Sequence, residues 1–178
     1  MDEYMSELKI PKARIAVLIG EKGEIKNKIQ KKLEVKLVID SKEGDIDIIG
    51  EDSVNILIAE KIVRAISRGF NPKHALKLIN ETYNLEVIDL TEFVGKNVRQ
   101  TKRVKSRLIG TDGKTRKTVE LLSNTKIVIY GKTISIIGDY INVGVARKAI
   151  ELLLIGKTHA TVYKWLEGQK RALSEKGF

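Results

Sequence analysis

The sequence Arg107-Leu108-Ile109-Gly110-Thr111-Asp112-Gly113 resembles a second one, Val17-Leu18-Ile19-Gly20-Glu21-Lys22-Gly23, which stands 90 positions earlier. The similarity continues downstream, where Ile48-Ile49-Gly50-Glu51 returns as Ile136-Ile137-Gly138-Asp139. The offset has fallen to 88 there, which fits short deletions in loops, the segments that tolerate them best. Self-similarity over this length indicates an internal duplication.

Both copies predict the same order of elements, β-α-α-β-β-α, and therefore an α+β fold. In the first copy, hydrophobic spacing and β-branched runs predict a strand at 7–10, helices at 11–19 and 25–33, strands at 35–39 and 46–49, and a long helix capped by Asp52 or Ser53. In the second copy they predict a strand at 85–90, helices at 91–108 and 114–122, strands at 125–130 and 133–137, and a long helix that ends at Ile155.

Two further helices are expected outside the repeats. Asn71-Pro72 is typical of a helix start and leads a linking helix that carries Ala75, Leu76, Ile79 and Tyr83. The segment 158–176 places Val162, Trp165, Leu166 and Leu173 on one side of a C-terminal helix. Packing of this side on the core is the expected role, and binding of a partner is the alternative. The predicted organisation is a first domain at 1–70, the linking helix at 71–84, and a second domain with the C-terminal helix at 85–178.

The two glycine loops are the feature of the repeats that indicates a function. A lone Gly-x-x-Gly is a weak signal. Here each loop lies between two short amphipathic helices and precedes two strands and a long helix, which is the pattern of a type I KH domain. In KH domains this loop clamps about four nucleotides of a single strand. Glycine lets phosphates approach the main chain, and the next helix offers unpaired amide groups and the positive end of its dipole. An ordinary tight turn is the alternative for such glycines, and the duplication argues against it.

The basic charge is concentrated in the second half. Residues 1–70 hold 13 basic and 13 acidic residues, so the net charge of +10 belongs to residues 71–178. Between Lys96 and Lys117 nine basic residues face the single acid Asp112, and such a run favours a polyanionic partner over a merely basic surface. We expect the second loop to dominate RNA affinity, because Glu21 and Glu24 repel phosphate at the first, where Arg14, Lys26 and Lys28 offset them only in part. The predicted RNA-binding residues are Arg103, Arg107, Gly110, Thr111, Asp112, Gly113, Lys114, Arg116, Lys117, Lys126, Ile127 and Ile129, with Gly20, Glu21, Lys22 and Gly23 in the first loop.

Enzyme classes find no support in the sequence. Three Gly-Lys-Thr triplets begin at Gly113, Gly131 and Gly156, but each lacks the upstream glycine of a phosphate-binding loop. The chain has no cysteine, and its two histidines have no partners at metal-ligand spacing. We therefore expect no enzyme activity, metal or cofactor. Nine scattered aromatic residues also disfavour the stacking platforms of RRM and OB modules.

Longer strings carry a resemblance to a known family. The chain resembles, over nearly its whole length, the archaeal counterpart of the KH-domain ribosome-assembly proteins called Dim-two or Partner-of-Nob-One, with the Krr-one group next. The strings are Arg68-Gly69-Phe70-Asn71-Pro72-Lys73-His74-Ala75-Leu76, Leu85-Glu86-Val87-Ile88-Asp89-Leu90, Lys102-Arg103-Val104-Lys105-Ser106-Arg107-Leu108-Ile109-Gly110 and Tyr130-Gly131-Lys132-Thr133-Ile134-Ser135-Ile136-Ile137-Gly138.

The resemblance implies binding of small-subunit ribosomal RNA near its 3′ end, alongside pre-ribosomal proteins and the Nob-one endonuclease that cleaves there. It assigns the RNA clamp to Gly110 and Gly113. Two alternatives stay open: a KH regulator of other single-stranded RNA, and a protein-binding scaffold. The absence of cysteine, of a secretory leader and of a membrane-spanning apolar run predicts a cytoplasmic protein without a membrane partner.

Overall fold

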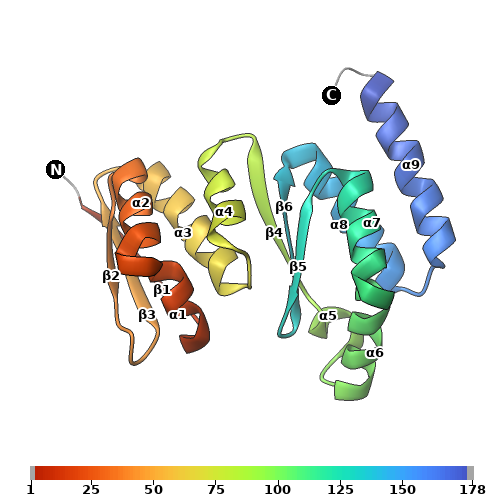
Figure 1. Cartoon of the computed structure of the whole chain (residues 1–178), viewed down its shortest axis with the longest axis horizontal. Helices are drawn as coiled ribbons and strands as arrows, with labels where there is room; N and C mark the ends of the chain where they lie inside the picture. Colours follow the sequence, from red (N-terminus) through yellow and green to blue (C-terminus); the bar gives the residue numbers. More distant parts are fainter. Residues whose placement is uncertain (1–2, 176–178) are drawn as a thin grey trace. The chain divides into compact units, whose positions relative to one another are not determined.

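The computed structural model describes residues 3–175 and divides the chain into two units, Met1–Glu81 and Thr82–Phe178. Figure 1 shows both units along the chain, each with its own sheet and helices. We call them unit 1 and unit 2. Unit 1 begins with the predicted order β-α-α-β-β-α, and unit 2 has the same order except that its first helix is divided in two. Each sheet has three antiparallel strands, with the third strand of the repeat in the centre.

Apart from its linking helix, unit 1 follows the predicted boundaries to about one residue, except that the first strand, predicted at 7–10, spans Tyr4–Lys9. Its elements are β1 (Tyr4–Lys9), α1 (Lys12–Ile19), the 3-10 turn η1 (Glu21–Gly23), α2 (Glu24–Leu33), β2 (Lys36–Ile39), β3 (Asp45–Gly50), α3 (Ser53–Ser67), α4 (Pro72–Ala75) and the 3-10 turn η2 (Leu76–Ile79). Asp52 caps α3 by accepting from the Val54 amide at 2.7 Å, as expected. Pro11 precedes the first helical residue, Lys12, and so stands one position earlier than predicted.

The predicted linking helix is shorter than expected. Asn71 caps α4 by accepting from the Lys73 amide at 2.9 Å, and Pro72 is the first helical residue, as the sequence indicates. The helix makes a single turn, continues as η2 and ends at Ile79. Both segments pack on α3 within unit 1. Tyr83 belongs to the next strand, so its assignment to this helix was wrong.

Unit 2 contains the C-terminal helix as well as the second repeat. Its elements are β4 (Tyr83–Asp89), α5 (Thr91–Val94), α6 (Val98–Ile109), the 3-10 turn η3 (Thr111–Gly113), α7 (Lys114–Ser123), β5 (Lys126–Tyr130), β6 (Thr133–Asp139), α8 (Tyr140–Leu154) and α9 (His159–Glu175). The C-terminal helix was expected over 158–176, and Lys176 lies outside the described residues.

The predicted single helix over 91–108 was wrong, because it is broken into α5 and α6. Gly95 has a φ of +61°, a conformation that an α-helix cannot contain. Asn97 then starts α6 by accepting from the Gln100 amide at 3.1 Å. The hydrophobic spacing of this segment gives no sign of the break. The break comes from Gly95, which ends α5, and from Asn97, which caps the start of α6.

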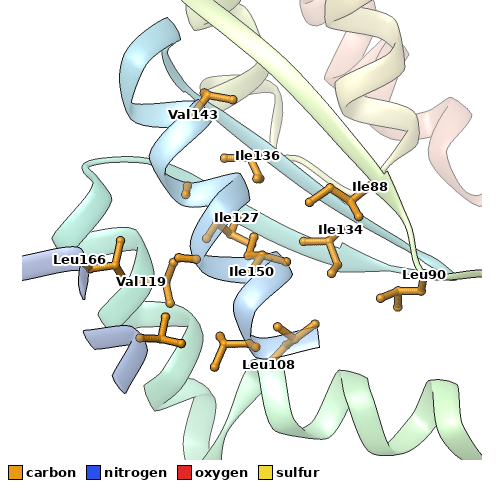
Figure 2. Packing of buried hydrophobic residues seen from close by; sticks show 14 residues of the cluster. Ile88, Leu90, Leu108, Val119, Ile127, Ile134, Ile136, Val143, Ile150 and Leu166 are labelled. Atoms are coloured by element: carbon orange, nitrogen blue, oxygen red, sulfur yellow. The ribbon is translucent and has the colours of Figure 1, made fainter. Parts of the chain in front are cut away.

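The hydrophobic core of unit 2 includes residues from both helices that flank the glycine loop. Figure 2 shows Ile134 and Ile136 of the central strand packed against Ile150 of α8, with Leu108 and Val119 from the two helices that flank the loop. Val162 and Leu166 of α9 belong to the same cluster and are fully buried. The apolar side of the C-terminal helix therefore packs on the core, the role expected for it.

Candidate nucleic-acid interface

The loop Gly110–Gly113 has a backbone that its two glycines make possible. The φ angles are +72° at Gly110 and +74° at Gly113, and the Gly113 amide closes the turn on the Gly110 carbonyl at 3.2 Å. Asp112 also has a positive φ, of +52°. The side chains of Thr111 and Asp112 are exposed at the tip.

The two glycines have different physical roles. A Cβ at Gly110 would lie 2.8 Å from the backbone nitrogen of Thr115 and 2.9 Å from its Cβ, so Gly110 lets the loop pack closely on α7. A Cβ at Gly113 would meet only the ends of flexible side chains, at 3.8 Å from Lys117 Cε and 3.9 Å from Arg116 Nη2. Gly113 also stands at the start of α7, where no side chain caps the helix. This position leaves backbone amides open to an anion.

The predicted cations around the loop divide into two groups. Lys114 and Lys117 on the first turn of α7 are exposed, as is Arg103 on α6. Arg116 is half-buried and donates to the Ile127 carbonyl at 3.4 Å. Arg107 donates through Nη2 to the Lys157 carbonyl, so its guanidinium holds α6 to the segment between α8 and α9. The loop therefore has exposed cations at Lys114, Lys117 and Arg103, whereas Arg107 and Arg116 hydrogen-bond to backbone carbonyls of the same unit.

The three predicted positions on β5 divide between the two faces of the sheet. Ile127 is only 3% exposed, and it lines a small hollow together with Ile129, Leu108 and Arg116, so its contact with a base stays a prediction. Ile129 is half-buried and packs against the core cluster of unit 2. Lys126 is exposed, but alternation along the strand points it to the opposite sheet face from Ile127, away from α6 and α7. The sequence shows which β5 side chains share a face of the sheet, but it does not show which of the two faces the helices cover.

A groove beside the loop was not predicted from the sequence. It has a volume of about 480 Å³ and lies between α6 and the β5–β6 turn, within unit 2. Its apolar floor includes Val98, which is 80% exposed, and Ile109, which is 37% exposed. Its other lining residues include the four lysines Lys96, Lys102, Lys105 and Lys132. The Lys105 ammonium donates to the Gly131 carbonyl and so connects its two walls.

This groove has the chemistry of a single-strand site. Exposed aliphatic side chains offer contact area to bases, and the lysines around them offer charge to phosphates. A sequence signal for it exists. Val98, Lys102, Lys105 and Ile109 recur at helical spacing, so one face of α6 mixes apolar and cationic residues while the turn Gly131-Lys132 faces it.

The loop in unit 1 repeats the geometry with different charges. Gly20 and Gly23 have φ angles of +74° and +79°. A Cβ at Gly20 would lie 2.6 Å from Ile25 Cγ1, whereas at Gly23 the nearest atom, Asn27 Nδ2, is 3.5 Å away. The side chains of Glu21 and Lys22 are exposed at the tip. The same fold therefore presents a tip with one acid and one base.

Arg14 of α1 makes its hydrogen bonds to the end of the long helix in unit 1. Its guanidinium donates to the carbonyls of Ile66 at 2.8 Å and Phe70 at 2.7 Å, at the end of α3. The guanidinium keeps its positive charge in these hydrogen bonds, so the partial compensation of Glu21 and Glu24 by Arg14 stays a prediction. Phe70 corresponds to Lys157 in the repeat, so in both units an arginine from the helix before the loop hydrogen-bonds to the segment that follows the long helix.

Titratable and metal-binding groups add little to either site. Between residues 3 and 175 no group of three or more His, Cys, Asp or Glu is placed to hold a metal ion. The described helices also include none that is long and apolar enough to span a bilayer. In the β2–β3 turn, hydrogen bonds from the Lys42 and Glu43 amides lower the pKa of Asp40, which makes this carboxylate a structural turn residue.

Comparison with known proteins agrees with this geometry. A family model described as a eukaryotic-type, type I KH domain, the second of PNO1, matches residues 84–171, which is nearly all of unit 2. A KH domain-containing protein of Methanocaldococcus jannaschii is 42% identical over 99% of this chain and 79% of its own length. The RNA-binding protein pno1 of Dictyostelium discoideum is 29% identical over 98% of this chain and 75% of its own length.

A solved structure completes the comparison. A crystal structure of the complex of a/eIF2alpha, aDim2p and rRNA from Pyrococcus horikoshii contains a chain 41% identical to this one, with a TM-score of 0.89 and 96% of both chains covered. This chain belongs to the Dim2/PNO1 family of KH-domain ribosome-assembly proteins. Unit 2, with the Gly110–Gly113 loop, is the part that matches the family's second KH domain. The family resemblance drawn from the sequence is confirmed.

Proposed function

We propose that this protein binds single-stranded precursor RNA of the small ribosomal subunit near its 3′ end and acts in subunit assembly. The observation that carries the proposal is the exposed Gly110–Gly113 loop, which adjoins an apolar groove surrounded by four lysines. The groove, the uncapped start of α7 and the exposed side chains of Lys114 and Lys117 offer bases and phosphates separate contacts. Membership of the Dim2/PNO1 family and the rRNA in the complex of the Pyrococcus relative support it.

In this proposal unit 1 is also a KH domain, but it binds RNA more weakly than unit 2. Its loop has the same backbone, but Glu21 and Glu24 add negative charge where phosphate would approach. The protein holds RNA and performs no chemical step, so a Nob-one-type endonuclease among the pre-ribosomal proteins would cut the strand that it presents. The proposed site of action is the cytoplasm.

The RNA attached in cells tests the proposal directly. Ultraviolet crosslinking of the protein, followed by sequencing of the attached RNA, should give reads concentrated at the 3′ end of small-subunit rRNA. A variant with Lys114 and Lys117 both replaced by Ala is the matched control, because it keeps the loop and the core while it removes two exposed cations. Reads spread over messenger or small RNAs would refute the ribosomal assignment, and reads that persist in the double variant would refute the role of this surface.

A further inference from the structure

The carbonyl of Arg107 lies on the last turn of α6, three residues before Gly110. The carbonyls at the end of an α-helix have no further helical amide to accept from. The Ser106 carbonyl accepts from the Gly110 amide at 2.9 Å. At Gly110 the chain then leaves the helical conformation, with a φ of +72° and a ψ of 176°. The next carbonyl, that of Arg107, is therefore open to a donor from another element of unit 2.

The side chain of His159, the first residue of α9, supplies this donor. His159 Nε2 lies 3.1 Å from the carbonyl oxygen of Arg107, a residue 52 positions away in the sequence. A carbonyl oxygen can only accept a hydrogen bond, so Nε2 carries the hydrogen and donates it. A donor in this place also offsets the partial negative charge at the end of the α6 dipole.

Contacts within α9 hold the His159 ring in this position. Thr158 Oγ1 accepts from the Thr161 amide at 3.2 Å and so caps the start of the helix. The imidazole stacks on the ring of Tyr163, with the centroids 6.2 Å apart and the planes at 16°. Leu166, about two turns along the helix, is fully buried in the core of unit 2. The donor is therefore fixed to the body of the unit.

The last turn of α6 is attached to the start of α9 in three ways. The Arg107 guanidinium donates to the Lys157 carbonyl, in the segment before α9. The Arg107 carbonyl accepts from His159. Leu108, the next residue, is buried in the same cluster as Leu166 of α9 (Figure 2). Only Ile109 separates Leu108 from the glycine loop, so these contacts act on the residues that lead directly into it.

Unit 1 cannot repeat the two hydrogen bonds with the residues at the same places. His159 corresponds to Pro72, at the offset of 87 that relates the ends of the two long helices. The proline side chain has no hydrogen-bond donor. Arg107 corresponds to Val17, whose side chain has none either. These bonds therefore belong to the unit whose loop is followed by exposed lysines.

We infer that His159 is a positioning residue for RNA binding: by donating to the Arg107 carbonyl it fixes the end of α6, and with it the loop Gly110–Gly113. The inference rests on the RNA-binding role proposed for this loop. A site that is already ordered loses less conformational entropy on binding than one that the ligand has to order. His159 acts through the loop and needs no contact of its own with the RNA strand.

Two substitutions separate the hydrogen bond from the packing of the ring. His159→Phe keeps an aromatic ring beside Tyr163 but has no donor. His159→Gln loses the ring but keeps an N–H group that can donate to a carbonyl. Ala160→Gln, at the next and exposed position of α9, is the matched control. Each full-length protein is measured by fluorescence anisotropy with a labelled single strand from the 3′ end of small-subunit rRNA, and thermal unfolding confirms that it is folded.

The expected results follow from the loss of one hydrogen bond. His159→Phe should weaken RNA binding about two- to tenfold, whereas His159→Gln should restore most of the affinity and Ala160→Gln should bind like the parent. In the RNA-free protein, hydrogen exchange of the amides in residues 108–114 should be faster in His159→Phe than in the parent. Exchange in residues 18–24 of unit 1 should be the same in both proteins.

Three outcomes would overturn the inference. Unchanged exchange at residues 108–114 in His159→Phe would show that His159 does not hold the loop. An unchanged Kd for this variant would show that the hold does not contribute to RNA binding. A loss in His159→Gln as large as in His159→Phe would assign the effect to the packing of the ring. Failure of the proposed function gives a different result: the parent itself does not bind the strand, while exchange at residues 108–114 still depends on His159.

Discussion

Replacing Thr111 by Asp should weaken RNA binding through charge alone. The substitution turns the tip of the second loop into Gly-Asp-Asp-Gly. Thr111 is exposed and its side chain makes no contact that the fold needs, so the loop backbone and the core stay intact. Replacing the glycines would be a poorer test, because a side chain at Gly110 collides with Thr115 and changes stability as well as binding.

The expected loss follows from Coulomb's law at a solvated position. Two unit charges about 4 Å apart repel by about 1 kcal/mol in water and about 4 kcal/mol near a protein surface of lower dielectric constant. An exposed loop tip lies near the lower end, so we expect a loss of about 1 to 2 kcal/mol, or roughly 5- to 30-fold in Kd. Added salt should reduce the difference, because it screens exposed charges.

The assay is fluorescence anisotropy with a labelled single strand from the 3′ end of small-subunit rRNA. Lys22→Asp is the matched control, because it gives the first loop the tip Gly-Glu-Asp-Gly with a larger change in charge. The control should cost less affinity than Thr111→Asp, because unit 2 holds most of the RNA. An unchanged Kd for Thr111→Asp, or a larger loss for Lys22→Asp, would refute this reasoning.

Three further predictions concern the loop and the groove. Gly110→Ala should lower the free energy of unfolding in urea by more than Gly113→Ala, because both carry a strain of about 1 kcal/mol for positive φ but only a Cβ at Gly110 meets backbone, 2.8 Å from the Thr115 nitrogen; equal losses would contradict the separate roles of the two glycines. Val98→Asp should weaken RNA binding measured by anisotropy and leave Tm unchanged, since Val98 is 80% exposed on the groove floor; an unchanged Kd would exclude the groove from the RNA path. Lys114→Ala should reduce the slope of log K against log salt by about 0.7, the value for one lost phosphate contact on a single strand; a slope equal to that of the parent would show that Lys114 contacts no phosphate.

The sequence was sufficient for the order of elements, because local patterns and an internal copy supported each other. Period-two and period-3.6 spacing located the strands and helices, and the caps at Asp52 and Asn71 are where the sequence placed them. The buried side of α9 was also predictable, since Val162 and Leu166 are spaced for one helical face. The break at Gly95 was missed, although a glycine followed by a capping asparagine was its local signal.

The site was predictable at the loop and much less so around it. Gly110 and Gly113 could be found because the loop backbone requires glycine at both positions, which gives the recognisable spacing Gly-x-x-Gly. The partners of Arg107 and Arg14 could not, because each donates to a carbonyl about 50 positions away, a relation that exists only after folding. The groove combines α6 with a turn more than 20 positions later, so it too depends on tertiary structure.

The measurement that tests the central claim most directly is the location of RNA on the protein. Full-length protein is crosslinked to a 4-thiouridine-substituted strand from the 3′ end of small-subunit rRNA, and the attached peptides are identified by mass spectrometry. The account predicts crosslinks within residues 95–132, at the Gly110–Gly113 loop and along the groove that includes Val98 and Lys132. Crosslinks confined to other parts of the chain, with none in this segment, would contradict it.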